Sequence, residues 1–351
     1  MDEKKTTIND IATAAGVSKT TVSRYINGRT DLISKETCTR IEMAIKLSGY
    51  RPNAIARGLK TQQSFLIGVM VADITSPFSA ALVSGISHGL VDDGYVPVFA
   101  NSENSGEREA AFVNSLLAHQ VDGLIVNATT ADQPNLISLA ASGFPVVLCD
   151  RSIADYNFDI ALGEYRAPVL DLVRHLHDEG FGRVVLVSQP YEQTSPRRTR
   201  HDAFVEGARS VFGVEDPEKD VFLIDPRFPK DIIRAVRTIV ETTPEGVTPA
   251  VIGVNSVTMV GILNAVEQLG LSMPGDIGIC GPDDWGWARQ MGWDWSEVMG
   301  GGITTFKVDP FDIGEAAAHL MAGRIADPAR DKETITIPSS ITVRSSTSRK
   351  A

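Results

Sequence analysis

One short run, from Gly16 to Arg24, constrains this chain more than any other part of its sequence. Apolar residues recur at helical spacing around Gly16, in two sets: Ile8, Ile11 and Ala12, then Val17, Val22 and Ile26. A glycine lets the backbone bend sharply between two helices, and Ser18 can cap the second one by accepting a free N–H. A third helix is predicted over residues 34–48, with Gly49 as its C-cap. The pattern predicts a helix-turn-helix and its supporting helix.

The polar side chains of the second predicted helix are of the kinds that bind nucleic acid. Lys19, Thr20, Ser23 and Arg24 remain exposed when its apolar face packs. Lys and Arg suit guanine edges or phosphates, and hydroxyls suit both base edges and phosphate oxygens. Short amphipathic helices joined by a glycine turn also occur in proteins that bind no DNA. The pattern alone therefore leaves both interpretations open.

Charge is distributed unevenly along the 351 residues. The whole chain carries −11, but residues 1–60 hold eleven Lys and Arg against six Asp and Glu, which is +5 and leaves −16 for the remainder. A basic head on an acidic body is what phosphate binding by one end of the chain requires. The length is too great for one ordinary domain and fits two or three.

The residues around these helices resemble a known family. The matching segments are Thr7-Ile8-Asn9-Asp10-Ile11-Ala12, Ala15-Gly16-Val17-Ser18, Thr21-Val22-Ser23-Arg24 and Tyr50-Arg51-Pro52-Asn53. In this order they resemble the lactose/galactose repressor (LacI/GalR) family of bacterial transcription regulators, and the resemblance covers essentially the whole chain. It implies an all-α helix-turn-helix head and an α/β body of two parallel-sheet lobes, like that of periplasmic binding proteins.

The resemblance also implies a hinge between head and body. The head would be residues 1–49, the hinge helix and linker residues 50–63, and the effector-binding and dimerisation body residues 64–351. In the family the hinge helix orders in the minor groove, where the residue matching Leu59 wedges into a base step; a plain linker is the alternative. The residues expected to contact DNA are Thr7, Ser18, Lys19, Thr20, Thr21, Ser23, Arg24, Asn27, Asn53, Ala56, Leu59 and Lys60.

From Phe65 onward, short apolar strands alternate with amphipathic helices, which predicts parallel sheets covered by helices. Strands are expected over residues 65–72, 96–100, 123–126, 146–149, 184–187, 221–224, 250–254 and 277–280. In the family the chain crosses back between the lobes. The first lobe would then hold about residues 64–162 and 303–326, and the second about 163–292 and 330–346.

Most of these strands end in a polar side chain. The residues at the ends are Asp73, Asn101, Asn127, Asp150, Gln189, Asp225, Asn255 and Asp283. Ligands of open α/β sheets bind outside the carboxyl ends of the strands, so we expect these side chains to converge on a cleft between the lobes. The alternative is that they cap the helices that follow, which we favour for Asn101 and Asp225.

Three guanidiniums, of Arg197, Arg198 and Arg200, lie at the start of a predicted helix. Positive charge there opposes the helix dipole, so an anionic partner is expected, and Arg pairs with carboxylates in a bidentate manner. Arg197 and Arg200 share a helix face, whereas Arg198 points elsewhere. A sugar acid would suit this set. The alternative is that Arg200 pairs with Asp283 or Asp150 across the cleft and a neutral sugar binds.

The resemblance adds to this pocket. Positions matching Arg200, Asn255 and Asp283 contact the effector in the family, and residues 71–78, 121–127 and 195–197 look most like its KdgR-type branch, which responds to 2-keto-3-deoxygluconate and related uronate-derived acids. The expected effector contacts are Asp73, Phe78, Asn127, Asp150, Arg151, Ser195, Arg197, Arg200, Asn255, Asp283 and Trp285. The aromatic-rich segment 285–302 looks longer than the family's usual link and either faces a sugar or packs on the surface.

No motif in the chain indicates a metal site, a cofactor or a catalytic centre. His175 and His177 fall on different helix faces, and the chain lacks the HExxH, GxSxG and Walker A patterns. We therefore expect no metal, no cofactor and no enzyme. The isolated Cys38, Cys149 and Cys280 indicate reduced thiols, and no apolar stretch is long enough to span a bilayer. The expected location is the bacterial cytoplasm, at the nucleoid when DNA is bound.

Together these features predict a DNA-binding transcription regulator, most simply a repressor. A homodimer would present its two 18–26 helices to a near-palindromic operator, and effector binding would change lobe closure and so the position of the hinges. A solute-binding receptor shares the bilobed body, but it would carry a signal peptide in place of the basic head. A tail without leucine heptads favours a dimer over a tetramer.

Overall fold

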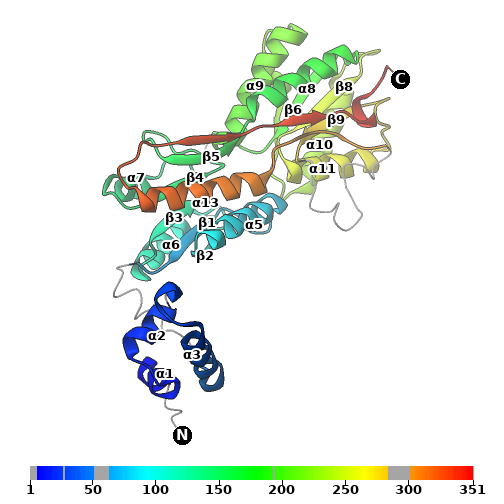
Figure 1. Cartoon of the computed structure of the whole chain (residues 1–351). Coiled ribbons are helices and arrows are strands. Elements are labelled where there is room, and N and C mark those ends of the chain that lie inside the picture. Colours follow the sequence, from blue (N-terminus) through cyan, green and yellow to red (C-terminus); the bar gives the residue numbers. More distant parts are fainter. Residues whose placement is uncertain (1–5, 27, 51–62, 193, 284–300, 351) are drawn as a thin grey trace. The chain divides into compact units, whose positions relative to one another are not determined.

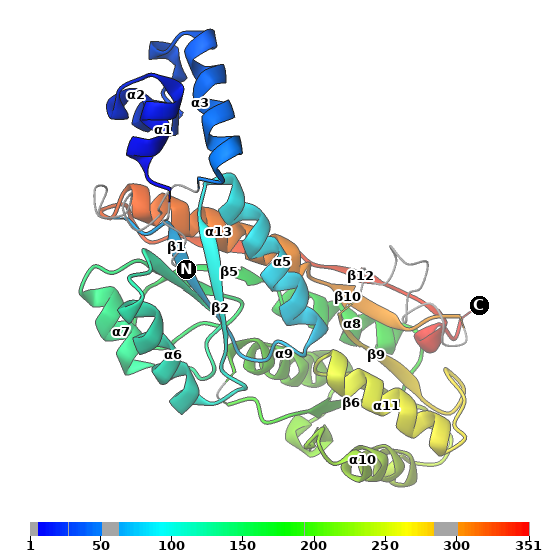
Figure 2. The ribbon, with the colours of Figure 1, turned by 90° about the horizontal axis from the view of Figure 1, so that it is seen from below.

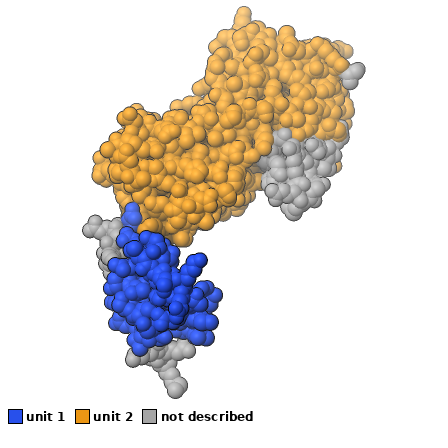
Figure 3. Space-filling model, in the orientation of Figure 1, with its two compact units in different colours: residues 1–64 blue, residues 65–351 orange. Residues whose placement is uncertain are grey.

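The computed structural model describes residues 6–26, 28–50, 63–192, 194–283 and 301–350. The chain divides into two compact units, Met1–Ser64 and Phe65–Ala351, which are coloured separately in Figure 3 and by sequence in Figure 1. None of the helices in the described part of the chain combines the length and the apolar character that spanning a bilayer needs.

Unit 1 has the three helices that the sequence predicts. They are α1 (Ile8–Ala15), α2 (Lys19–Ile26) and α3 (Lys35–Ser48), with the 3-10 turn η1 (Thr30–Leu32) before α3. Gly16 ends α1 with φ 65°, a conformation that a residue with a Cβ rarely adopts. The Ser18 hydroxyl accepts a hydrogen bond from Thr21 N at 3.1 Å, which caps α2 as expected. The core consists of fully buried side chains, one from each helix: Ile11, Val22 and Ile41.

Unit 2 has two lobes, each built on a six-stranded sheet. The order in the first sheet is β11 (Thr334–Ile337), β5 (Asp159–Gly163), β4 (Val146–Cys149), β3 (Gly123–Val126), β1 (Leu66–Val71) and β2 (Val96–Asn101). All its strand pairs are parallel. The order in the second sheet is β12 (Ser340–Thr342), β10 (Thr304–Lys307), β9 (Gly278–Pro282), β8 (Pro249–Gly253), β6 (Arg183–Ser188) and β7 (Val221–Leu223). Only its β10–β12 pair is antiparallel.

Helices cover both faces of each sheet. In the first lobe, α5 (Pro77–Asp92) and α13 (Pro310–Ala326) share one core with the sheet, and α6 (Gly106–Ala118) and α7 (Pro134–Ala141) share another. In the second lobe the pairs are α8 (Arg166–Asp178) with α9 (Ser195–Phe212), and α10 (Pro229–Thr242) with α11 (Ser256–Gln268). The 3-10 turns η2 (Pro217–Asp220) and η4 (Ser345–Thr347) complete the described elements of this lobe. The arrangement confirms the predicted parallel sheets with helices on both faces.

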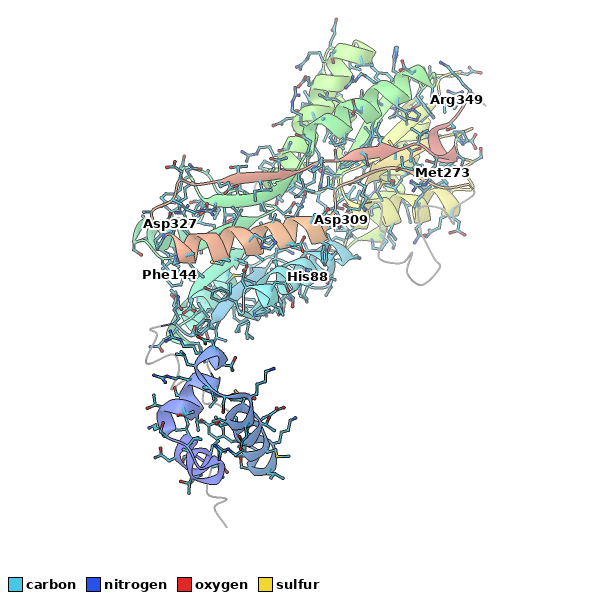
Figure 4. The ribbon with its side chains drawn as sticks, in the orientation of Figure 1. His88, Phe144, Met273, Asp309, Asp327 and Arg349 are labelled. Carbon is cyan, nitrogen blue, oxygen red and sulfur yellow. The ribbon has the colours of Figure 1, made fainter. Side chains whose placement is uncertain are left out.

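Helices α5 and α13 lie side by side, as Figure 2 shows. A Cβ at Gly85 of α5 would clash with the carbonyl oxygen of Phe311, so glycine permits this close approach of the two backbones. His88 Nδ1 lies 2.9 Å from Glu315 Oε1 and joins the outer sides of the two helices. Asp309 and Asp327, labelled in Figure 4 with His88, flank the two ends of α13.

Two strands lie in the sheet opposite to the one expected from the resemblance. The resemblance places residues 303–326 in the first lobe; α13 does lie there, but β10 pairs with β9 of the second sheet. It places residues 330–346 in the second lobe; β12 does lie there, but β11 pairs with β5 of the first sheet. For β11 the structure shows an ionic anchor: fully buried Asp159 on β5 accepts hydrogen bonds from Glu333 N and from Arg324 of α13. It holds the chain against the first sheet before the chain crosses to β12.

Candidate functional site

The exposed face of α2 carries most of the predicted DNA contacts. Ser18, Lys19, Thr20 and Arg24 are exposed, and Ser23 is half-buried. Thr21 is also half-buried, and its hydroxyl lies 2.9 Å from Ser18 Oγ, so it is engaged in the helix cap. An exposed row of hydroxyl, ammonium and guanidinium groups along a short helix suits contact with phosphates and base edges.

Thr7 is placed at the start of α1, where it and Asp10 form a reciprocal capping box. Its hydroxyl donates to Asp10 Oδ2 at 2.7 Å. The N-terminus of a helix presents free N–H groups and suits a phosphate. The other predicted DNA contacts lie outside the described residues: Asn27, Asn53, Ala56, Leu59 and Lys60.

A cleft of about 1190 Å³ lies between the two lobes of unit 2, at the carboxyl ends of the strands. Most of the predicted effector contacts line it: Asp73, Phe78, Asn127, Asp150, Arg151, Arg197, Arg200, Asn255 and Asp283. Ser195 does not line the cleft; its hydroxyl instead accepts Ser152 N at 2.8 Å, which joins the second lobe to the first. Trp285 and the rest of segment 284–300 lie outside the described residues.

Two aspartates at strand ends have left-handed backbones. Asp150, after β4, has φ 65°, and Asp283, after β9, has φ 71°. Non-glycine residues in this region carry backbone strain, which is found disproportionately at functional sites. Asp283 Oδ2 accepts Ser256 N at 2.9 Å. Asp150 belongs to the first lobe and Asp283 to the second, so each lobe contributes one of these two carboxylates.

Asp150 is the most deeply buried carboxylate of the cleft, with 8% of its surface exposed. It accepts a hydrogen bond from the hydroxyl of Tyr165, and Asn127 Nδ2 lies 3.4 Å from its other oxygen. Burial raises the pKa of Asp150, while the Tyr165 hydroxyl and the charges of Arg151 and Arg200 act in the opposite direction.

Arg200 enters the cleft from α9 and is 7% exposed. Its Nη1 donates to Val254 O at 3.0 Å, and its Cζ lies 4.3 Å from the ring centroid of Tyr165. Its buried Nε has no hydrogen-bond partner among the described residues. Within that part of the chain it forms no ion pair with Asp150 or Asp283, the pairing on which the neutral-sugar alternative rested.

Two further guanidiniums face the same space. Arg197 Nη1 donates to Pro190 O at 2.5 Å, and Arg151 Nη1 donates to Ala128 O at 3.0 Å. Burial and the repulsion of the other two guanidiniums lower the pKa of Arg197 to about 10. Among the described residues no carboxylate forms an ion pair with either one. Arg198 points away, as predicted, and donates to Glu192 O.

Asn101 and Asp225 do not cap the helices that follow them, so that expectation is wrong. Asn101 Oδ1 accepts Ile74 N at 3.1 Å, and Asp225 holds Arg227 in a bidentate pair at the cleft. Asn255 lines the cleft and also caps α11, since its Oδ1 accepts Thr258 N at 3.0 Å. Asn255 is therefore both a cleft residue and a helix cap.

Sequence reasoning missed several residues of the site. Glu103, Asn104, Thr129 and Thr130 line the cleft a few residues beyond the ends of β2 and β3. Their signal in the sequence is their place in the loops that follow these two strands, whose carboxyl ends face the cleft. Tyr165, which contacts two cleft residues, has no signal in the sequence because its contacts come from segments far along the chain.

Comparison with known proteins gives matches over both units. Residues 7–53 match a family model described as bacterial regulatory proteins, lacI family, and residues 173–347 match one described as a periplasmic binding protein-like domain. The HTH-type transcriptional regulator KdgR of Bacillus subtilis is 36% identical over 341 residues, 97% of each chain. PtxS of Pseudomonas aeruginosa, a regulator of the same type, is 32% identical over 98% of this chain and 96% of its own.

A solved structure of the lac repressor dimer, bound to operator and an anti-inducer, has a similar fold. Its TM-score is 0.79 at 24% identity, and the match covers 98% of this chain and 99% of that one. A transcriptional regulator CelR–cellobiose complex matches with a TM-score of 0.69 at 23% identity, over 97% of this chain and 99% of that one.

Proposed function

The chain belongs to the lacI family of bacterial regulatory proteins and is a DNA-binding transcription regulator with a ligand-binding domain, and we propose that it is a repressor controlled by a sugar acid. Its similarity to regulators along almost the whole of their length means that it is not an enzyme. The head over residues 1–49, the hinge helix and linker over residues 50–63, the body over residues 64–351 and the cytoplasmic location belong to this proposal.

One observation carries the choice of a sugar acid. Arg151, Arg197 and Arg200 converge on the cleft, and none forms an ion pair with a carboxylate of the described chain. Gathering like charges in a partly buried space is unfavourable unless an anion joins them. A carboxylate ligand provides that charge and fits the planar fork of a guanidinium.

The remaining cleft residues suit the hydroxylated part of such a ligand. Asp150 and Asp283 offer carboxylate oxygens to hydroxyl groups, and Asn127 offers an amide. Phe78 supplies an apolar ring for the carbon face of a sugar. We favour 2-keto-3-deoxygluconate or a related uronate product, and a neutral sugar bound by the same carboxylates is the alternative.

The DNA-binding form that we propose is a homodimer on near-palindromic operator DNA. Half-sites one helical turn apart, or a multiple of it, require two α2 helices related by twofold symmetry. Each lobe exposes apolar side chains that a second copy could cover: Val91, Val98 and Phe99 on α5 and β2, and Val260 on α11. Effector binding would change the closure of the lobes and thereby the spacing of the two heads.

Calorimetric titration of the full chain tests the sugar-acid proposal. We compare 2-keto-3-deoxygluconate with glucose for the wild type and for Arg197→Ala. Arg209→Ala is the matched control, since Arg209 is exposed on the same helix and lies outside the cleft. Selective binding of the acid that weakens only in Arg197→Ala supports the proposal. Binding of glucose would leave a regulator with a neutral effector, and an acid affinity that does not depend on Arg197 would contradict the arginine-lined carboxylate site.

A further inference from the structure

Tyr165 lies where the chain first crosses from one lobe to the other. It follows β5 of the first sheet and precedes α8 of the second lobe, and it is 4% exposed. A Cβ at Gly163 would lie 2.8 Å from the ring Cζ of Tyr165 and would clash with Val308, which belongs to the second crossing, between β10 and α13. The phenol ring of Tyr165 and the side chain of Val308 therefore both pack against Gly163, and both belong to one buried core.

Two cleft residues, one from each lobe, contact this single side chain. The Tyr165 hydroxyl donates to Asp150 Oδ1, at the end of β4 in the first lobe. Arg200, on α9 of the second lobe, places its Cζ 4.3 Å from the centroid of the Tyr165 ring. A guanidinium over an aromatic face at this distance is attracted to it. Tyr165 itself does not line the cleft.

We propose that Tyr165 is a positioning residue of the effector cleft, which orients the Asp150 carboxylate with its hydroxyl and holds the Arg200 guanidinium with its ring. The lobes then present an acceptor and a cation at a fixed separation, although the two residues form no ion pair with each other. The statement about ligand binding rests on the proposed function, whereas the contact with Asp150 does not.

The hydroxyl also acts on the charge of Asp150. A hydrogen bond donated to a carboxylate favours its ionised form and opposes the effect of burial on the pKa of Asp150. Burial and the nearby Asp150 raise the pKa of Tyr165 well above its usual value, so the phenol keeps its proton. The groups that face Asp150 are Tyr165, Asn127, Arg151, Arg197, Arg200, Asp283 and the Cys149 thiol.

Tyr165→Phe in the full chain removes the hydroxyl and keeps the ring, so it distinguishes the effects of the two groups. The ring and its packing remain, so the variant is expected to fold. NMR titration of isotope-labelled aspartate carboxyl groups, with the Asp150 signal assigned by Asp150→Asn, should show that Asp150 takes up its proton at a higher pH in Tyr165→Phe than in the wild type. Tyr95→Phe, outside the cleft, should not change it. An unchanged titration of Asp150 in Tyr165→Phe would overturn the proposal.

Effector binding gives the second measurement. Tyr165→Phe should bind 2-keto-3-deoxygluconate about tenfold more weakly, because a hydrogen bond to a charged group is lost. The pH below which affinity falls should also move upward, and in an Asp150→Asn background the same substitution should have little effect. Equal affinity at every pH would count against the positioning role. If the wild type binds no sugar acid, the proposed effector fails, while the carboxyl titration still decides the role of Tyr165.

Discussion

The carboxylate of Asp159 on β5 is bound by the guanidinium of Arg324 on α13, with Nε 2.8 Å from Oδ2 and Nη2 3.1 Å from Oδ1. Asp159 is completely buried and Arg324 is 4% exposed. Glu333 N donates to the same carboxylate at 3.0 Å, one residue before β11 begins. One ion pair thus joins an inner strand, the covering helix and the edge strand of the first lobe.

Replacing Asp159 with Asn should destabilise unit 2 strongly. The substitution leaves Arg324 buried without a counter-charge, and breaking a buried pair in this way costs about 3–5 kcal/mol. Urea unfolding of the full chain measures the loss. Asp171→Asn is the matched control, because Asp171 pairs with Arg174 on the surface and such pairs contribute at most about 1 kcal/mol. If the two substitutions lower the free energy of unfolding equally, burial does not strengthen the Asp159–Arg324 pair.

The contribution of Asp159 should depend on pH in a defined direction. Burial alone would raise the pKa of Asp159, but Arg324, Glu333 N and Lys332 together lower it. Since the folded value lies below the unfolded one, the stabilisation is present above the unfolded pKa of about 4 and is lost as the pH falls through the folded pKa. The gap in unfolding free energy between wild type and Asp159→Asn should therefore narrow in acid.

Glu109 on α6 should behave in the opposite way. Its Oε2 accepts Thr129 N and Thr129 Oγ1 at 2.8 and 2.7 Å, but its Oε1 is buried without a partner among the described residues. Burial raises the pKa of Glu109, although the bonds from Thr129 oppose the rise. The ionised form is therefore disfavoured in the folded state, and its cost appears as the pH rises from the unfolded pKa through the folded one.

Glu109→Gln removes this cost and leaves an acceptor for Thr129. Its unfolding free energy relative to wild type should increase as the pH rises from acid to neutral, as urea unfolding at several pH values would show. Glu107→Gln, exposed on the same helix, provides the control. A Glu109→Gln difference that stays constant with pH would mean that the folded protein does not disfavour the charged carboxylate.

The local pattern of the sequence predicted the head because every element there is fixed by neighbours in the chain. Gly16 ends α1, Ser18 caps α2, and Gly49 ends α3 with φ 63°. Strand β5 was missed because it begins with a charged residue, Asp159, which becomes acceptable in a strand only through Arg324, 165 residues later. The placement of β10 beside β9 and of β11 beside β5 likewise depends on pairing between distant segments.

The cleft was predictable to the extent that it follows a general rule. Parallel strands place their carboxyl ends on one edge, so Asp73, Asn127 and Asp150 were found from strand ends alone. The helical spacing of the arginine run likewise brought Arg197 and Arg200 to one face. Tyr165 could not be found in this way, because its role depends on meeting Arg200, 35 positions away, at a crossing that the sequence pattern does not mark.

The exposed edge of β2 should carry part of the proposed dimer interface. Phe99 is 43% exposed there, beside Val91 of α5, which is 61% exposed. Phe99→Asp would place a charge in a surface that a second copy covers, so the full chain should sediment as a monomer at concentrations where the wild type is a dimer. Phe112→Asp is the control, since Phe112 is on α6, against the opposite face of the sheet. If the Phe99→Asp variant remains a dimer, the interface lies elsewhere.

Arg24 should determine which DNA the head selects. It is exposed on α2, and a guanidinium that contacts a guanine edge discriminates by about 1–3 kcal/mol per half-site. Selection from a random pool of double-stranded DNA should enrich a near-palindrome with the wild type, and Arg24→Ala should lose preference at one position of each half-site. Lys46→Ala removes the same charge from α3, where Lys46 pairs with Glu42 at 2.7 Å, and should leave the selected sequence unchanged. If both variants weaken DNA binding equally and select the same DNA sequence as the wild type, Arg24 contacts phosphate. Base recognition is then the role of Lys19 and Thr20.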